Sequence, residues 1–101
     1  MLLQVQKKLA IKDLGDRFVI DADGLRSYLL YRCDGLYLDL YCAYVPESLR
    51  GNHHAESMIL FAFKFAVMNG YLIKPNCAAV RAFVKIYPEW RYIIDKASLF
   101  N

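Results

Sequence analysis

The chain has 101 residues, of which 57% are apolar and 15% aromatic, and its formal net charge is +3. This size fits one domain over residues 1–101 with a modest core, and the apolar content excludes a disordered chain. The weak positive charge is spread along the sequence, so it does not predict nucleic-acid binding. The longest apolar run, Ala55–Met68, includes Lys64 and is too short to cross a membrane, so it predicts a core helix.

The three cysteines are an odd number in a chain without a recognisable secretory leader. This usage is typical of a reducing compartment, so we expect a cytoplasmic protein. Cysteines and histidines together could suggest zinc. No two of them have the Cys-x-x-Cys or His-x₃-His spacing of zinc ligands, so the sequence predicts no metal site.

The N-terminal segment, residues 1–16, is ambiguous, because Leu2–Ile11 could form a strand or an ordered arm and Gly15 interrupts it. Two pairs, Asp23-Gly24 and Asp34-Gly35, then predict tight hairpin turns. The turns separate three expected strands of an antiparallel meander, Arg17–Ala22, Leu25–Cys33 and Leu36–Val45.

Alternation along the third strand assigns its side chains to two faces. One face is expected to carry Leu36, Leu38, Leu40, Cys42 and Tyr44. The other is expected to carry Tyr37, Asp39, Tyr41, Ala43 and Val45. Pro46 has no amide hydrogen and therefore ends the strand pairing.

A long helix is expected over residues 52–69, with Gly70 as the residue that ends it. Apolar side chains surround most of this helix, so it needs cover on more than one side, from the second helix or from a partner chain. The side chains that point in several directions around it are Phe61, Phe63, Phe65 and Met68. Because one sheet face cannot cover them all, the sequence predicts a homodimer.

The C-terminal third is expected to hold a short strand, Tyr71–Lys74, and a second helix over Cys77–Tyr87 with Asn76 as its N-cap. Pro88 ends that helix, and Trp90–Phe100 follows as an irregular or helical tail. The expected fold class is α+β in the order β-β-β-α-β-α. Its sheet is mixed, mostly antiparallel and packed with two main helices.

The junction between the third strand and the long helix, Val45–Glu56, has the pattern of an anion site. The first amides of a helix lack acceptors within the helix, and the helix dipole adds positive potential there. Since Arg50 and Gly51 lie in this turn, phosphate or pyrophosphate is the expected ligand class. An ordinary loop before a helix is the alternative.

The same junction resembles a known family. Val45-Pro46-x-x-x-Arg50-Gly51-x-x-x-Ala55 is similar to the acetyl-CoA loop of the smallest GNAT-like N-acetyltransferases, in which the loop reads Arg/Gln-x-x-Gly-x-Gly/Ala. Two later runs are similar to the C-terminal half of that family. They are Asn76-Cys77-x-x-Val80 and Tyr87-Pro88-Glu89-Trp90, and the resemblance covers residues 17–94.

The resemblance implies that the chain binds acetyl-CoA and transfers its acetyl group to an amine of a small molecule or a protein. The loop amides would hold the CoA pyrophosphate, and the end of the third strand would pair with pantetheine. The implied cofactor-binding residues are Ala43, Tyr44, Val45, Arg50, Gly51, Asn52, His53, His54, Ala55, Glu56 and Asn76. Asn76 would contact the pantetheine arm or only cap the helix.

The loop departs from the family at His53, which stands where a glycine is usual. Glycine is useful where the backbone must approach a ligand closely or adopt a positive φ. When protonated, His53 or His54 could add charge to the phosphate site, or both could be ordinary exposed loop residues.

Cys77 and Cys42 are the candidate catalytic residues. Small GNAT-like relatives carry a cysteine at the position of Cys77, and a helix N-terminus favours the reactive thiolate, although a small buried hydrophobe is the alternative. Cys42 stands where the relatives have a histidine that could act as a general base. Tyr41, Tyr44 or a loop histidine could take over that role.

Arg81 and Lys85 form a cationic stripe on the second helix, which is either a contact for the 3′-phosphate of CoA or a solvated face. The alternative function is a non-catalytic CoA-fold module that acts through protein contacts. The residues His53 and Cys42 favour this alternative, whereas Arg50-Gly51 and Cys77 oppose it.

Overall fold

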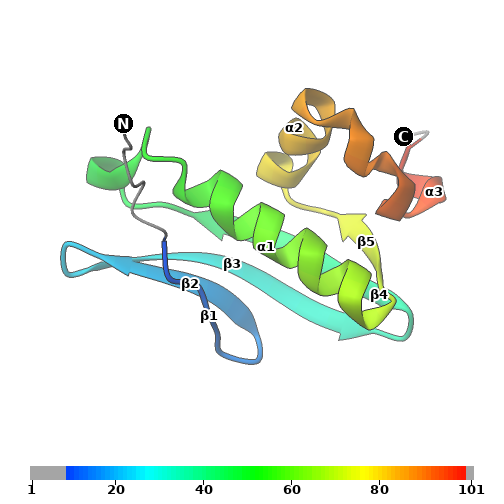
Figure 1. Cartoon of the computed structure of the whole chain (residues 1–101), viewed down its shortest axis with the longest axis horizontal. Coiled ribbons are helices and arrows are strands. Elements are labelled where there is room, and N and C mark those ends of the chain that lie inside the picture. The colour runs from blue at the N-terminus through cyan, green and yellow to red at the C-terminus, as the bar shows by residue number, and fades with distance from the viewer. Residues whose placement is uncertain (1–8, 100–101) are drawn as a thin grey trace, which may run out of the picture.

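The computed structural model describes residues 9–99, in which five strands form one sheet and α1 lies across one face of it (Figure 1). The strands are β1 (Lys12–Asp13), β2 (Arg17–Ala22), β3 (Leu25–Asp34), β4 (Tyr37–Tyr44) and β5 (Leu72–Pro75). The helical elements are η1 (Glu47–Leu49), α1 (His54–Asn69), α2 (Ala78–Ile86), η2 (Pro88–Ile93) and α3 (Lys96–Leu99). The strands lie in chain order and pair antiparallel except for β4 and β5, which are parallel. The expected α+β fold with a mixed, mostly antiparallel sheet is therefore confirmed.

The two Asp-Gly pairs form the predicted hairpins. Asp23 and Gly24 both have positive φ, 54° and 74°, as a two-residue type I′ turn requires. In the second hairpin Asp34 pairs with Tyr37, so the loop is Gly35–Leu36, one residue later than predicted. Leu36 is consequently exposed in a turn and does not belong to the buried face of β4.

A β-bulge at Tyr41 interrupts the alternation that the sequence predicts for β4. Leu40 pairs with Tyr31 and Cys42 pairs with Leu30, which leaves Tyr41 without a partner residue on β3. One extra residue exchanges the two faces of the strand beyond it.

The faces of β4 change accordingly. Leu38 and Leu40 are fully buried, but beyond the bulge Ala43 and Val45 pack against the core and Tyr44 is 43% exposed. The prediction that Cys42 and Tyr44 share a face with Leu40 is therefore wrong, because strict alternation does not hold through a bulge.

The long helix α1 begins two residues later than predicted. His53, directly before it, has the left-handed conformation with φ 62° and ψ 23°, which cannot continue into the helix. At the other end Gly70 has φ 74°, and its amide donates to the carbonyl oxygens of Ala66 and Val67, so the predicted terminating role of Gly70 is confirmed.

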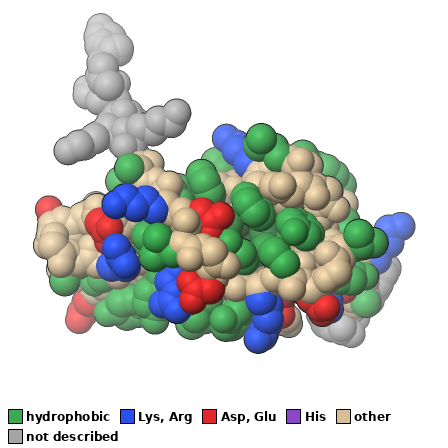
Figure 2. Space-filling model, turned by 90° about the horizontal axis from the view of Figure 1, so that it is seen from below, with side chains coloured by type: hydrophobic (Ala, Val, Ile, Leu, Met, Phe, Trp, Pro, Cys, Tyr) green, Lys and Arg blue, Asp and Glu red, His purple; other side chains and the backbone are tan. Residues whose placement is uncertain are grey.

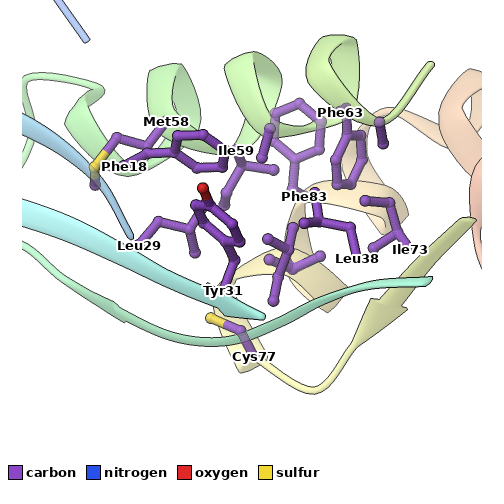
Figure 3. Close-up of a cluster of buried hydrophobic side chains, with 14 of the residues drawn as sticks. Phe18, Leu29, Tyr31, Leu38, Met58, Ile59, Phe63, Ile73, Cys77 and Phe83 are labelled. Atoms are coloured by element: carbon purple, nitrogen blue, oxygen red, sulfur yellow. The ribbon is translucent and has the colours of Figure 1, made fainter. Parts of the chain in front are cut away.

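The core lies between α1, the sheet and the C-terminal elements (Figure 3). Phe63 of α1 is fully buried, and its ring lies 5.4 Å from that of Phe83 in α2 and 5.6 Å from that of Trp90 in η2. The C-terminal elements therefore supply much of the second cover that α1 needs. Phe61 and Met68 remain 36% and 85% exposed.

The start of α2 differs from the prediction, because Cys77 and not Asn76 is its N-cap residue. The Asn76 side chain donates from Nδ2 to Oδ1 of Asp39 at 2.9 Å, and Arg32 donates from Nε to Oδ2 of the same carboxylate at 3.1 Å. Hydrogen bonds to a carboxylate are stronger than neutral ones, so the Asn76 amide is drawn to β4 and leaves the helix end uncapped.

The chain ends are described only in part. Of Leu2–Ile11, residues 2–8 lie outside the described residues, and Leu9 and Ile11 pack against the core ahead of β1. The tail predicted over Trp90–Phe100 forms part of η2 and α3, and Phe100 lies outside the described residues. In the described part of the chain, no helix combines the length and apolar content needed to cross a membrane.

Candidate functional site

The strands β4 and β5 stop pairing where the bulge begins. Their pairs join Tyr37–Leu40 of β4 to Leu72–Pro75 of β5, and β5 ends there. Pro75 has no amide hydrogen to extend the ladder. Within residues 9–99, the edge of β4 from Tyr41 to Tyr44 that faces away from β3 therefore has no strand partner.

A cavity of about 450 Å³ lies where this open edge meets the start of α1. Its lining residues are Ala43, Tyr44, Val45, Leu49, Arg50, Gly51, His53, His54, Ala55, Glu56 and Ala79. All but Leu49 and Ala79 belong to the set that the sequence implies. Asn52 and Asn76 of that set do not line the cavity.

The turn into α1 presents backbone donors to this cavity. Ser57 donates its amide to the carbonyl oxygen of His53 at 2.9 Å, which is the first hydrogen bond of the helix. The amides of His54, Ala55 and Glu56 therefore have no acceptor within the helix. Gly51 has φ 89° with open space where a Cβ would lie, so its backbone is accessible to a ligand. These groups lie in the turn for which the sequence predicts an anion site.

Arg50 adds a cation to the same turn. Its Nε donates to the carbonyl oxygen of Val45 at 2.9 Å, which ties the guanidinium to the end of the strand edge. Arg50 is an exposed residue, and it lines the cavity. An arginine held in this way can offer paired donors to a phosphate.

His53 and Glu56 form a pair at the entrance of the cavity, with His53 Nδ1 2.6 Å from Glu56 Oε1. The Tyr87 hydroxyl donates to the other carboxylate oxygen at 3.3 Å. The hydrogen bond from His53 holds the pKa of Glu56 below its usual value, and the negative charge of Glu56 raises the pKa of Tyr87. Glu56 thus places a carboxylate in the same cavity as the unpaired helix amides, where it would repel a bound anion.

His54 is buried and lines the inner wall of the cavity. Its Nδ1 lies 3.3 Å from the hydroxyl of Ser27, a fully buried residue of β3. Among the described residues, every buried side-chain nitrogen or oxygen has a hydrogen-bond partner. Nε2 of His54 has no such partner, so this atom is not fully buried. The pairing joins residues 27 positions apart, and no local sequence pattern indicates it.

Neither of the two catalytic candidates is among the lining residues. Cys77 is 5% exposed and belongs to the hydrophobic core (Figure 3), where it begins α2. Cys42 is half-buried on β4 just beyond the bulge. All three cysteines are unpaired thiols. Within residues 9–99, no three His, Cys, Asp or Glu side chains gather as a metal-binding group.

A family model described as GCN5-related N-acetyl-transferase matches residues 17–93. No curated protein matches the chain in sequence. The matched segment runs from the start of β2 to the end of η2, so it includes the open edge of β4, the turn into α1 and the start of α2. The chain therefore belongs to the GCN5-related N-acetyltransferase family.

Proposed function

We propose that the chain binds acetyl-CoA in the cavity between β4 and α1 and transfers the acetyl group to an amine. The observation that carries this proposal is the meeting of an unpaired strand edge and unpaired helix amides at one cavity. A strand edge suits a ligand with its own amides, and helix amides suit a phosphate. Acetyl-CoA combines both groups in one extended molecule.

The residues that would hold acetyl-CoA fall into two sets. The edge over Ala43–Val45 would form backbone hydrogen bonds with the pantetheine amides. Arg50, Gly51 and the amides of His53–Ala55 would hold the pyrophosphate. The carboxylate of Glu56 limits the affinity of this second set, because it adds a negative charge to the same cavity.

The transfer itself needs a neutral acceptor amine, because a protonated amine has no free electron pair to attack the acetyl carbon. The bound cofactor supplies the acetyl group as a thioester. As the amine nitrogen bonds to the acetyl carbon, the carbon–sulfur bond breaks, the amine loses a proton and the departing thiolate gains one. Tyr44, His53 and His54 line the cavity and could accept the amine proton directly or through water.

A second route would use a cysteine. In this route the thiolate of Cys77 takes the acetyl group with release of the CoA thiol, and the amine then displaces the cysteine sulfur. Cys77 is buried and outside the cavity lining, so this route requires the start of α2 to move. Cys42 belongs to the open edge of β4 but is also outside the lining. Direct transfer needs no such movement.

A catalytically weak or inactive CoA-binding module is the second candidate function. The specific observation in its favour is that neither Cys77 nor Cys42 lines the cavity that suits CoA. Binding and catalysis must therefore be measured separately.

Binding is tested by calorimetric titration of CoA into the parent protein and three variants. The Arg50→Ala/Gly51→Asp variant removes a cation and adds an anion, so we expect affinity to fall by at least about tenfold, or roughly 1.4 kcal/mol. Because Gly51 has φ 89°, aspartate there also strains the loop, and Arg50→Ala alone serves as the unstrained variant. Lys64→Ala removes an exposed cation of α1 that lies outside the cavity lining. Equal affinity of all four proteins would show that CoA binds elsewhere.

Catalysis is tested by following CoA release from acetyl-CoA in the presence of a panel of small amines and lysine peptides. The proposal expects release that depends on the amine and is lost in Arg50→Ala at low acetyl-CoA concentration. Saturable CoA binding without amine-dependent release would replace the transferase proposal with the non-catalytic module.

A further inference from the structure

The cations on the sheet are neutralised by carboxylates. Figure 2 looks onto the molecule from below the sheet and shows Lys and Arg side chains beside Asp and Glu. The pairs are Lys12 and Arg26 with Asp21, Arg17 with Asp16, Arg32 with Asp39, and Lys74 with Asp34. This surface therefore has little unpaired positive charge for an anion.

The C-terminal elements carry a different arrangement. Arg81 and Lys85 of α2 and Arg91 of η2 line a cavity of about 410 Å³ between α2, η2 and α3. No Asp or Glu is among the described residues that line it. Within residues 9–99, none of the three cations has an ion-pair partner. Asp95 follows the lining residue Ile94, but it forms no ion pair with any of these three cations.

Arg81 is held in place before any ligand arrives. Its Nη1 donates to the carbonyl oxygen of Pro75 at 2.9 Å, which fixes the guanidinium against the end of β5. Lys85 follows one helical turn later on the same face. The Arg81 side chain is already partly fixed in the unliganded chain, so binding costs it less conformational entropy.

The shape and chemistry of the cavity indicate the kind of ligand. Three cations that face one cavity repel one another, and a bound oxyanion relieves this repulsion. Arginine offers a planar fork of donors that matches carboxylate and phosphate oxygens. Val84, Pro88 and Ile94 add apolar walls to the same cavity. The lining therefore suits a ligand that has an apolar organic part as well as a negative charge.

We infer that this cavity, defined by Arg81, Lys85 and Arg91, binds a small organic oxyanion that carries carboxylate or phosphate groups. It is a separate site from the cavity between β4 and α1, since the two have no lining residue in common. The helix α2 contributes to both: Ala79 lines the first, and Arg81 and Lys85 line the second. The inference does not depend on the transferase proposal.

The test is a titration of the whole chain with citrate, and in parallel with glycerol 3-phosphate, followed by amide and arginine Nε signals in nuclear magnetic resonance spectra. We expect saturable shifts at Arg81, Lys85 and Arg91 with at least one of the two anions. Lys85→Gln/Arg91→Gln should weaken this binding by about tenfold or more. Arg81 is left intact because its bond to Pro75 supports the fold.

Lys64→Gln is the control, because it removes an exposed cation of α1 outside this cavity. Equal weakening by Lys64→Gln and by the double variant would reduce the effect to overall charge and overturn the inference, as would the absence of saturable shifts up to about 20 mM of both anions. The relative affinity for citrate and glycerol 3-phosphate identifies the preferred anionic group.

The titration is repeated with CoA at saturation. Unchanged anion affinity supports a separate site, whether or not acetyl transfer occurs. Displacement of the anion by CoA would show that this cavity holds part of CoA and would overturn the separate site.

Discussion

His53 adopts a left-handed backbone at the loop position where the resemblance of the sequence implies a glycine. For a residue with a Cβ this conformation costs roughly 1–2 kcal/mol. The pair with Glu56 offsets part of that cost, but an exposed ion pair contributes less than about 1 kcal/mol. The histidine therefore strains the turn. Its side chain also hinders a ligand from coming close to the backbone of His53.

His53→Gly relieves the strain, which stabilises the free and the bound chain alike, so we expect a higher melting temperature. It also lets a phosphate approach the backbone more closely, so we expect CoA to bind about fivefold more tightly, or roughly 1 kcal/mol. The control is His53→Ala, which loses the imidazole but keeps the Cβ. It should melt below the glycine variant by several degrees. Calorimetry and thermal melts check both points, and weaker CoA binding by the glycine variant would show that the imidazole contacts the phosphate.

Cys77 is almost fully enclosed in the core, whereas Cys33 is exposed and Cys42 is half-buried. We therefore expect iodoacetamide to label Cys33 fastest and Cys77 slowest in the native protein. Cys77→Ala should lower the melting temperature, because it leaves a small void in the core, and should keep amine-dependent CoA release. Mass spectrometry of the labelled peptides measures the rates. Rapid labelling of Cys77 that CoA prevents would instead support the acetyl-cysteine route.

Glu56 near the start of α1 pairs with His53 directly before the helix and accepts a hydrogen bond from Tyr87 at the end of α2, so it links the two helices. Its pKa is lower in the folded chain than the ordinary value of 4.5. A lowered carboxyl pKa contributes stability above the unfolded value, and this contribution is lost as the pH falls through the folded value. The link between the helices should therefore weaken in acid.

Glu56→Gln tests this link and its effect on the anion site. At neutral pH we expect the variant to melt below the parent, and the difference should disappear well below pH 4.5. CoA should bind about two- to fivefold more tightly, because a negative charge near the phosphate is removed. Glu47→Gln is the control, since Glu47 is exposed in η1 and outside the cavity lining. Unchanged CoA affinity in Glu56→Gln would place the phosphate away from this carboxylate.

Sequence patterns predict the features of this fold that depend on neighbouring residues. Asp23-Gly24 forms its hairpin and Gly70 ends α1, because each turn needs a positive φ at that one place. The bulge at Tyr41 depends on the pairing of two strands, and Asn76 bonds to Asp39, 37 positions away. No local pattern contains this information.

The candidate site likewise combines residues that a local sequence pattern indicates with residues that only tertiary packing brings together. The loop over residues 50–56 was predictable, because consecutive residues form it. Ala79 reaches the same cavity only through the packing of α2, and Ser27 meets His54 only through the sheet. These contacts require the tertiary structure.

The helix α1 is covered by the sheet on one side and by α2 and η2 on another. Phe63 has its cover within the chain, but Phe61, Val67 and Met68 remain exposed. The homodimer stays a prediction that now rests on this exposed side of α1. Sedimentation should give a mass that rises with concentration from 11.7 kDa towards twice that value, and Met68→Lys should reduce the rise. A constant mass of 11.7 kDa would contradict self-association.

The proposed function depends on one claim, that acetyl-CoA occupies the cavity between the open edge of β4 and the start of α1. A titration of the labelled chain with acetyl-CoA, followed residue by residue through amide shifts, tests it most directly. We expect saturable shifts concentrated at residues 43–45 and 50–56, with smaller changes near Ala79. Saturable shifts confined to other surfaces, or none at millimolar acetyl-CoA, would contradict the claim.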